Sequence, residues 1–289
     1  MSRSKVRAYP DGSSQCIHRS EIESCANSAA ESRRVSGATP EVAVRLDQRT
    51  HLDDARYRVI LRDFGGGLVE IGWSFVPTSC AVKAGRGQSE NADHNRDRAV
   101  RRARSRLRHL ILTIGADHLL TLTYRENVGD FERACADLKK FVRLVKARKR
   151  DWQYIAVAER QRRGAWHWHL AVVGRQDLAL LRTSWGRVAG DGNIDVARAK
   201  SSRHSGSLAL VRYLGKYLAK GFDDDRALNA RRFRASIGIE VPMQVLKVPP
   251  CRRGETIAFA LEELQRVAGF VGHVWQSDDL SAGWACSWA

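Results

Sequence analysis

The sequence lacks the features that mark membrane proteins and disulfide-rich secreted proteins. No stretch of the 289 residues approaches the roughly 20 consecutive apolar residues that a membrane-spanning helix needs. The start of the chain has no apolar core of a secretory signal. The six cysteines include no C-x-x-C pair, which disfavours a structural zinc ribbon and favours reduced thiols. We therefore expect a cytoplasmic protein that has no membrane partner.

Acidic residues are scarce relative to basic ones. The chain has 49 Lys and Arg against 32 Asp and Glu, a net charge of +17. Such an excess favours a polyanionic partner, and nucleic acid is the partner that remains once a membrane is disfavoured. Hydrophobic residues make up 43% of the chain, so most of it should be globular.

Composition and periodicity divide the chain into four parts. Residues 1–55 have no sustained periodicity and are predicted to be disordered. Residues 56–115 contain two β-rich runs around a glycine turn, followed by a basic helix, and form a predicted DNA-contacting extension. Residues 116–222 alternate strand and helix patterns and carry the motifs described below. Residues 223–289 form an extension of unknown role.

The basic helix of the second part is dense in arginine. Residues 96–108 contain seven arginines and one aspartate, while Val100, Ala103 and Leu107 share one helical face. A solvated face on a packed helix would explain this pattern. Phosphate contacts are favoured because so many like charges repel one another unless an anion is near. The predicted DNA-binding residues are Arg98, Arg101, Arg102, Arg104 and Arg108.

The run GAWHWHLAVVG at 164–174 places two imidazoles side by side. On a strand, His167 and His169 lie on one face and the neighbouring tryptophans on the other. Glu159 ends the preceding strand, and a turn of about five residues brings it back beside the histidines. Two imidazoles and a carboxylate suit a catalytic divalent cation with open positions, Mg²⁺ or Mn²⁺, while zinc stays open.

The run VRYLGKYLAKGF at 211–222 reads as a helix with two tyrosines and two lysines. Tyr213, Lys216, Tyr217 and Lys220 share one face, which we expect to point outward, opposite a leucine face. A phenol attacks phosphorus only when cations stabilise the developing charge, and the lysines and a metal would supply them. The alternative is an amphipathic helix whose tyrosines rim the core.

Three motifs in this order, LLTLTY (119–124), GAWHWHLAVV and YLGKYLAK, resemble those of the HUH endonucleases, specifically the rolling-circle replication initiators (Rep proteins) of plasmids and single-stranded DNA phages. The resemblance implies an α+β fold with a central, about five-stranded antiparallel sheet and flanking helices. It also implies a nuclease domain over 116–222 that nicks an origin through a 5′-phosphotyrosine intermediate. The leaving 3′-hydroxyl would prime replication, with a host helicase and polymerase as partners.

Two other functions share these features. A single-strand DNA transposase uses similar chemistry, although the chain has no cysteine-rich zinc module at its N-terminus. A DNA-binding regulator that retained the fold would not need the intact set of Glu159, His167, His169 and the tyrosines. Whether one or both tyrosines attack stays open.

Overall fold

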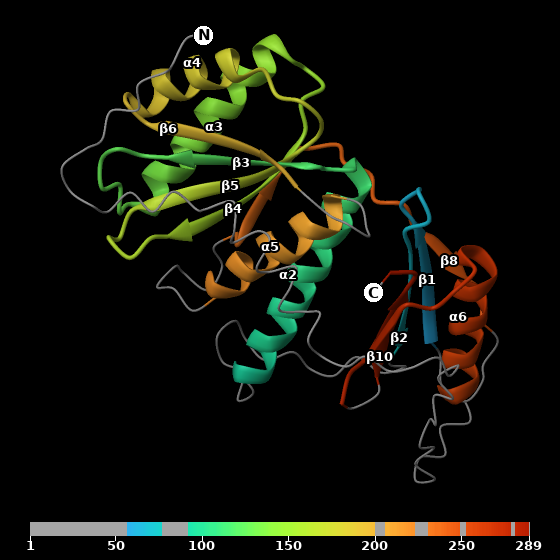
Figure 1. Ribbon diagram of the computed structural model, residues 1–289. Coiled ribbons are helices and arrows are strands. Elements are labelled where there is room, and N and C mark those ends of the chain that lie inside the picture. Colours follow the sequence, from blue (N-terminus) through green and yellow to red (C-terminus); the bar gives the residue numbers. More distant parts are fainter. Residues whose placement is uncertain are drawn as a thin grey trace, which may run out of the picture.

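The computed structural model describes residues 57–76, 92–199, 206–222, 231–248, 253–278 and 281–288; the predicted disordered segment 1–55 lies outside these ranges. Its strands form two antiparallel five-stranded sheets (Figure 1). The central sheet has the order β6-β3-β5-β4-β7, and the flanking sheet has the order β8-β1-β2-β10-β9. The predicted α+β fold with a five-stranded antiparallel sheet is therefore confirmed.

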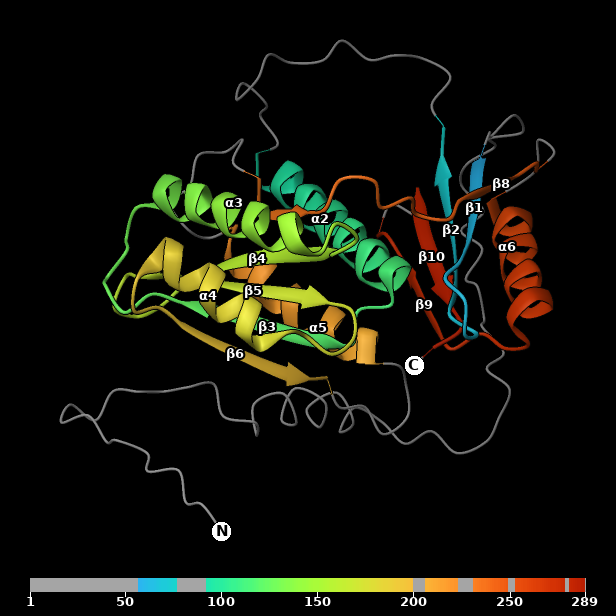
Figure 2. The ribbon, with the colours of Figure 1, turned by 90° about the horizontal axis from the view of Figure 1, so that it is seen from above.

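Helices cover both faces of the central sheet. One face packs on α3 and α4, and the other on α2 and α5 (Figures 1 and 2). The strands alternate apolar side chains toward each face, which is why both faces are buried. The elements of this part are α2 (Ala92–Ile114), β3 (His118–Thr123), α3 (Phe131–Arg148), β4 (Tyr154–Arg160), β5 (Trp166–Val172), α4 (Leu178–Ala189), β6 (Asn193–Arg198), α5 (Gly206–Lys220) and β7 (Phe233–Ala235).

The flanking sheet joins segments from distant parts of the sequence. The predicted hairpin is confirmed, and its turn has three glycines at positive φ, Gly65, Gly66 and Gly67, a conformation that suits residues without a Cβ. C-terminal strands then pair on both sides of this hairpin, so the predicted segments 56–115 and 223–289 share one sheet. Its elements are β1 (Tyr57–Asp63), β2 (Val69–Phe75), β8 (Gln244–Leu246), α6 (Arg253–Ala268), β9 (His273–Gln276) and β10 (Ala282–Cys286).

Helix α3 follows its predicted pattern. The Asp130 side chain accepts a hydrogen bond from the backbone N–H of Glu132 at 2.8 Å and so caps the helix. Lys146 and Arg148 lie in the last turn, where they oppose the negative end of the helix dipole. The side chains of Ala134, Leu138, Phe141 and Val145 are buried in the core.

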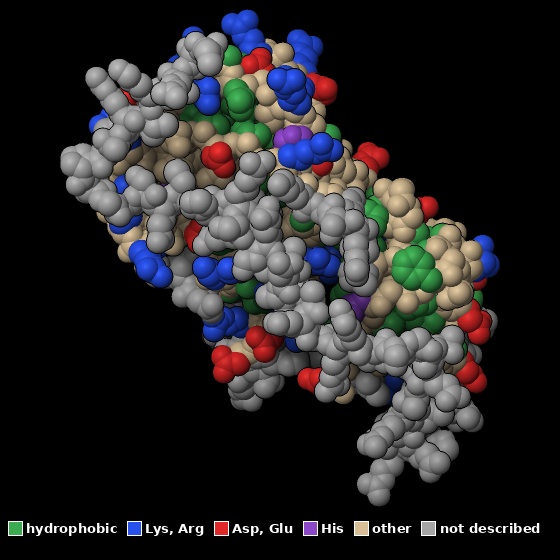
Figure 3. Space-filling view, viewed as in Figure 1, with side chains coloured by type: hydrophobic (Ala, Val, Ile, Leu, Met, Phe, Trp, Pro, Cys, Tyr) green, Lys and Arg blue, Asp and Glu red, His purple; other side chains and the backbone are tan. Residues whose placement is uncertain are grey.

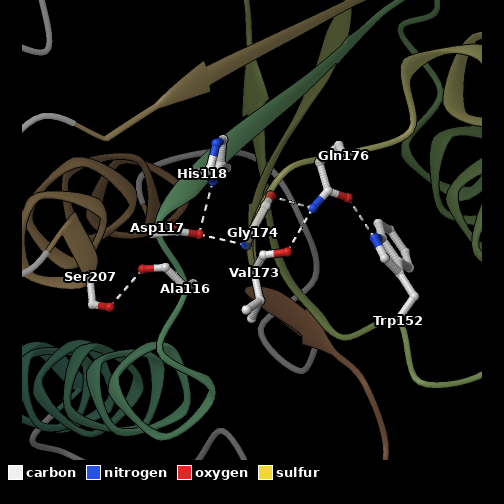
Figure 4. A network of polar contacts seen from close by, with 8 residues as sticks. All are labelled: Ala116, Asp117, His118, Trp152, Val173, Gly174, Gln176 and Ser207. Carbon is white, nitrogen blue, oxygen red and sulfur yellow. Dashed lines mark hydrogen bonds and ion pairs between the residues drawn. The ribbon is translucent and has the colours of Figure 1, made fainter.

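Polar contacts fix the end of the central sheet where β3 begins (Figure 4). Asp117 accepts hydrogen bonds from the backbone N–H of Gly174 and from His118, although burial of the carboxyl works against the lowered pKa that these bonds produce. The Ser207 hydroxyl donates to the Ala116 carbonyl at 2.6 Å. This bond ties the start of α5 to the sheet. Among the described helices, none is long and apolar enough to cross a membrane.

Candidate active site

The predicted histidine strand is confirmed as β5. Trp166 and Trp168 pack into the core under α3 and α4, while His169 faces the tyrosines of α5. Glu159 pairs directly with His167 across β4 and β5, because the two strands are antiparallel and joined by a short turn. The carboxylate and both imidazoles therefore lie together on one sheet face.

His169 is held from two sides. Its Nε2 lies 2.9 Å from Oε2 of Glu159, and its Nδ1 lies 3.3 Å from the hydroxyl of Thr121. Thr121 is the direct cross-strand partner of His169 in β3. The sequence contained Thr121 only as part of the first motif, and its contact with His169 depends on strand register, which local sequence does not reveal.

His167 is buried, and its Nε2 has no hydrogen-bond partner among the described residues. Burial, with a smaller effect from His169, lowers the pKa of this imidazole to about 4. The ring is therefore neutral at pH 7. A neutral imidazole with an unused nitrogen is a good ligand for a cation.

The donor types fit a divalent cation, because neutral imidazole nitrogens and a carboxylate suit Mn²⁺ well and can join water in holding Mg²⁺. In this conformation no three His, Cys, Asp or Glu side chains in the described ranges are grouped closely enough to hold an ion. The Glu159 carboxylate is instead engaged by His169 and by Nζ of Lys220, which lies 3.7 Å from Oε1. A rotation of this one side chain would be needed to bring the three donors together.

The outward orientation predicted for Tyr213 and Tyr217 is wrong. Their exposed fractions are 3% and 6%, and both pack against the central sheet. The Tyr217 ring stacks on His169 with 4.7 Å between centroids, and the Tyr217 hydroxyl donates to that of Tyr213 at 3.4 Å. Helix α5 lies between the sheet and α2, so it has buried side chains on more than one face.

The two lysines of the motif differ in position. Lys220 lies at the site, with its Nζ 5.3 Å from the centre of the Tyr217 ring. Lys216 is exposed. The structure thus brings together Glu159, His167, His169, Tyr213, Tyr217 and Lys220.

The arginines of α2 also fall into two groups. Arg98, Arg101, Arg102 and Arg104 are exposed. Arg108 is turned toward the flanking sheet, where its Nε donates to Glu70 at 2.7 Å and its guanidinium lies 4.4 Å from the centre of the Trp284 ring. We therefore keep a DNA-contacting role as a proposal for the four exposed arginines, since Arg108 already has an anionic partner.

Comparison with known protein families agrees with this arrangement. Residues 117–222 match the family model of the replication-associated protein ORF2/gene 2 protein. A crystal structure of the hypothetical protein ORF119 from Sulfolobus islandicus rod-shaped virus 1 is similar at 12% identity, covering 43% of this chain and 97% of that chain with a TM-score of 0.29. No curated protein matches. The predicted resemblance to Rep-type replication initiators is therefore confirmed for residues 117–222, which resemble replication-associated proteins of this family.

Proposed function

We propose that the protein is a metal-dependent DNA nicking and joining enzyme that initiates rolling-circle replication. The observation that supports this most is the meeting of two histidines, one glutamate and two tyrosines on one face of the central sheet. The family match to replication-associated proteins covers this part of the chain. DNA binding without cleavage is the alternative that the experiments below address.

In the proposed reaction a tyrosine hydroxyl oxygen attacks the phosphorus of a DNA phosphodiester. A tyrosine–phosphorus ester bond forms, the bond from phosphorus to the 3′-oxygen breaks, and the released 3′-oxygen takes up a proton. Attack by a 3′-hydroxyl on the phosphotyrosine reverses these changes and joins the strand. The free 3′-hydroxyl would prime a host polymerase, with a host helicase opening the duplex.

Each side chain has a role that fits its position. A bound Mg²⁺ or Mn²⁺, held by Glu159, His167 and His169, would polarise the scissile phosphate. Lys220 lies beside Tyr217, where its charge stabilises the negative charge that develops on a phenol oxygen during attack. With only 3.4 Å between the two tyrosine hydroxyls, both could reach one phosphate in turn.

The roles of the tyrosines can be tested with Tyr213→Phe, Tyr217→Phe and the double variant. Phenylalanine keeps the ring packing, so these variants should fold, and Tyr124→Phe on the opposite sheet face is a matched control. If the tyrosines alternate, each single variant retains some cleavage of a supercoiled plasmid carrying the origin, and the double variant has none. Mass spectrometry should find DNA attached to either residue. Full cleavage by the double variant would exclude a tyrosine nucleophile at this site.

A further inference from the structure

A groove of about 940 Å³ lies between α2 and α3, with the chain around β7 as its floor. Figure 2 shows these two helices near each other over the β4 edge of the central sheet. Its lining contains no acidic side chain among the described residues. The lining includes six basic side chains: Arg106, Lys139, Lys146, Arg231, Arg232 and Arg234.

The groove combines this charge with apolar surface. Its walls include Leu110, Leu138 and Val142, and Ile237 at the groove is 97% exposed. The Nε of Arg234 is buried without a hydrogen-bond partner in the described part of the chain. A buried guanidinium nitrogen of this kind is stabilised when an anion accepts its proton.

The floor of the groove is held in place. Strand β7 pairs with β4, and the Ser236 hydroxyl accepts a hydrogen bond from the backbone N–H of Tyr154. Arg232 donates to the Gly221 carbonyl at the end of α5 and lies over the Phe222 ring. The groove is therefore connected to the helix that carries both tyrosines.

Strand register also places the groove near the candidate active site. Phe233, which lines the groove, pairs with Val157, and Val157 pairs with His169. Paired residues point to the same sheet face, and neighbouring strands lie about 4.8 Å apart. His169 is thus roughly 10 Å across the sheet from Phe233, counted as two strand spacings.

We propose that this groove holds a single strand of DNA and leads it to the candidate active site. The basic side chains would contact the phosphates, and the apolar walls would contact unpaired bases. A duplex keeps its bases stacked inside and has no use for an apolar floor, so a single strand is the better occupant. The proposal rests on the proposed function only for the statement that the bound strand is the one to be cut.

The test compares two triple variants that remove the same charge. Arg106→Gln/Lys139→Gln/Lys146→Gln changes the groove, and Lys140→Gln/Arg143→Gln/Arg182→Gln changes exposed residues outside its lining. Binding of a fluorescent single-stranded oligonucleotide and of its duplex is measured by anisotropy against salt. We expect the groove variant to flatten the single-strand slope of log K against log salt by about two units, at roughly 0.7 for each phosphate that is no longer neutralised. The control should leave this slope unchanged.

Several results would overturn the proposal. Equal slopes for the two triple variants would mean that the groove does not bind the strand. An equal loss of single-strand and duplex affinity would show that unpaired bases are not recognised there. If the triple groove variant does not fold, the neighbours Lys139→Gln and Lys140→Gln give the same contrast at one position each. A wild type that binds with this contrast but never cleaves would refute the proposed function and leave the groove as a binding site for single-stranded DNA.

Discussion

His167 and His169 lie two residues apart on one strand but are held differently. Both ring nitrogens of His169 have neighbours within 3.3 Å, Thr121 and Glu159. His167 has a buried Nε2 with no hydrogen-bond partner in the described ranges and a pKa lowered to about 4, first by burial. The structure thus keeps one imidazole oriented by hydrogen bonds and the other neutral by burial, and both conditions favour cation binding.

The lowered pKa of His167 predicts a loss of stability in acid. Below the ordinary pKa of about 6.5 the unfolded chain binds a proton here, whereas the folded chain does so only near pH 4. Between these values the free energy of unfolding should fall by up to about 3 kcal/mol more in the wild type than in His167→Gln. Urea unfolding in EDTA across this pH range measures the difference. Parallel curves for the two proteins would show that His167 titrates normally.

Thr121 is expected to orient His169 for cation binding. Thr121→Val keeps the volume but removes the hydroxyl next to Nδ1, so the affinity for Mn²⁺ should fall roughly ten-fold, the lower end of the usual effect of such neighbours. Thr121→Ser keeps the hydroxyl and should bind nearly as the wild type does. Calorimetric titration with Mn²⁺ compares the three proteins. Equal affinity in Thr121→Val would mean that this side chain only fills space.

At the scale of elements, sequence patterns predicted the long helices and paired strands well, because 3.6- and 2-residue periodicities are local. Helix α5 was predicted with the correct bounds to within a residue but with the wrong side inward, since tyrosine suits both a core and a surface. The three-residue strands β7 and β8 were not predicted. Too short to show alternation, they are strands only because distant partners offer hydrogen bonds.

The exposed arginines of α2 should supply a salt-dependent share of DNA affinity. Replacing Arg98, Arg102 and Arg104 by Gln should flatten the slope of log K against log salt for duplex DNA by roughly two to three units, at about 0.9 for each phosphate that they neutralise. The matched control replaces three exposed arginines near α4, Arg175, Arg182 and Arg187. Anisotropy at several salt concentrations gives both slopes. Similar slopes in the two variants would return α2 to the role of a solvated helix.

At the scale of the whole molecule, α2 connects the two sheets. It packs on the central sheet through Leu107 and Ile111, and on the flanking sheet through Leu112, which contacts the C-terminal residues. Basic side chains are present along the surface where α2 and α5 lie (Figure 3). A shift of the flanking sheet would therefore move the basic helix relative to the candidate site, so the contacts at this junction matter for DNA positioning as well as for stability.

Glu70 is the buried charge at this junction. It lies in β2, is 2% exposed, and is contacted by Arg108 at 2.7 Å and by Nε2 of His109 at 2.6 Å, both from α2. Burial alone would raise the pKa of Glu70, but the His109 hydrogen bond and the Arg108 charge outweigh it and lower the pKa. Burial lowers the pKa of His109, so the neutral ring donates its Nε2–H to the carboxylate. The ion pair with Arg108 is thus the charged contact that joins the sheets.

Removing one partner of this pair should cost more than removing both. Glu70→Gln leaves the Arg108 charge buried without its anion, and Arg108→Met leaves the Glu70 carboxylate without its cation, so each should lower the free energy of unfolding by about 3–5 kcal/mol. The double variant should lose less than the sum of the two, because no uncompensated charge remains. Because the folded-state pKa of Glu70 is depressed, its contribution is present above the ordinary value near 4.5 and is lost as the pH falls through the folded-state value. Urea unfolding at pH 7 and pH 4, followed by tryptophan fluorescence since Arg108 lies over Trp284, measures both effects. Additive losses with no dependence on pH would show that the two sheets are joined by apolar packing alone.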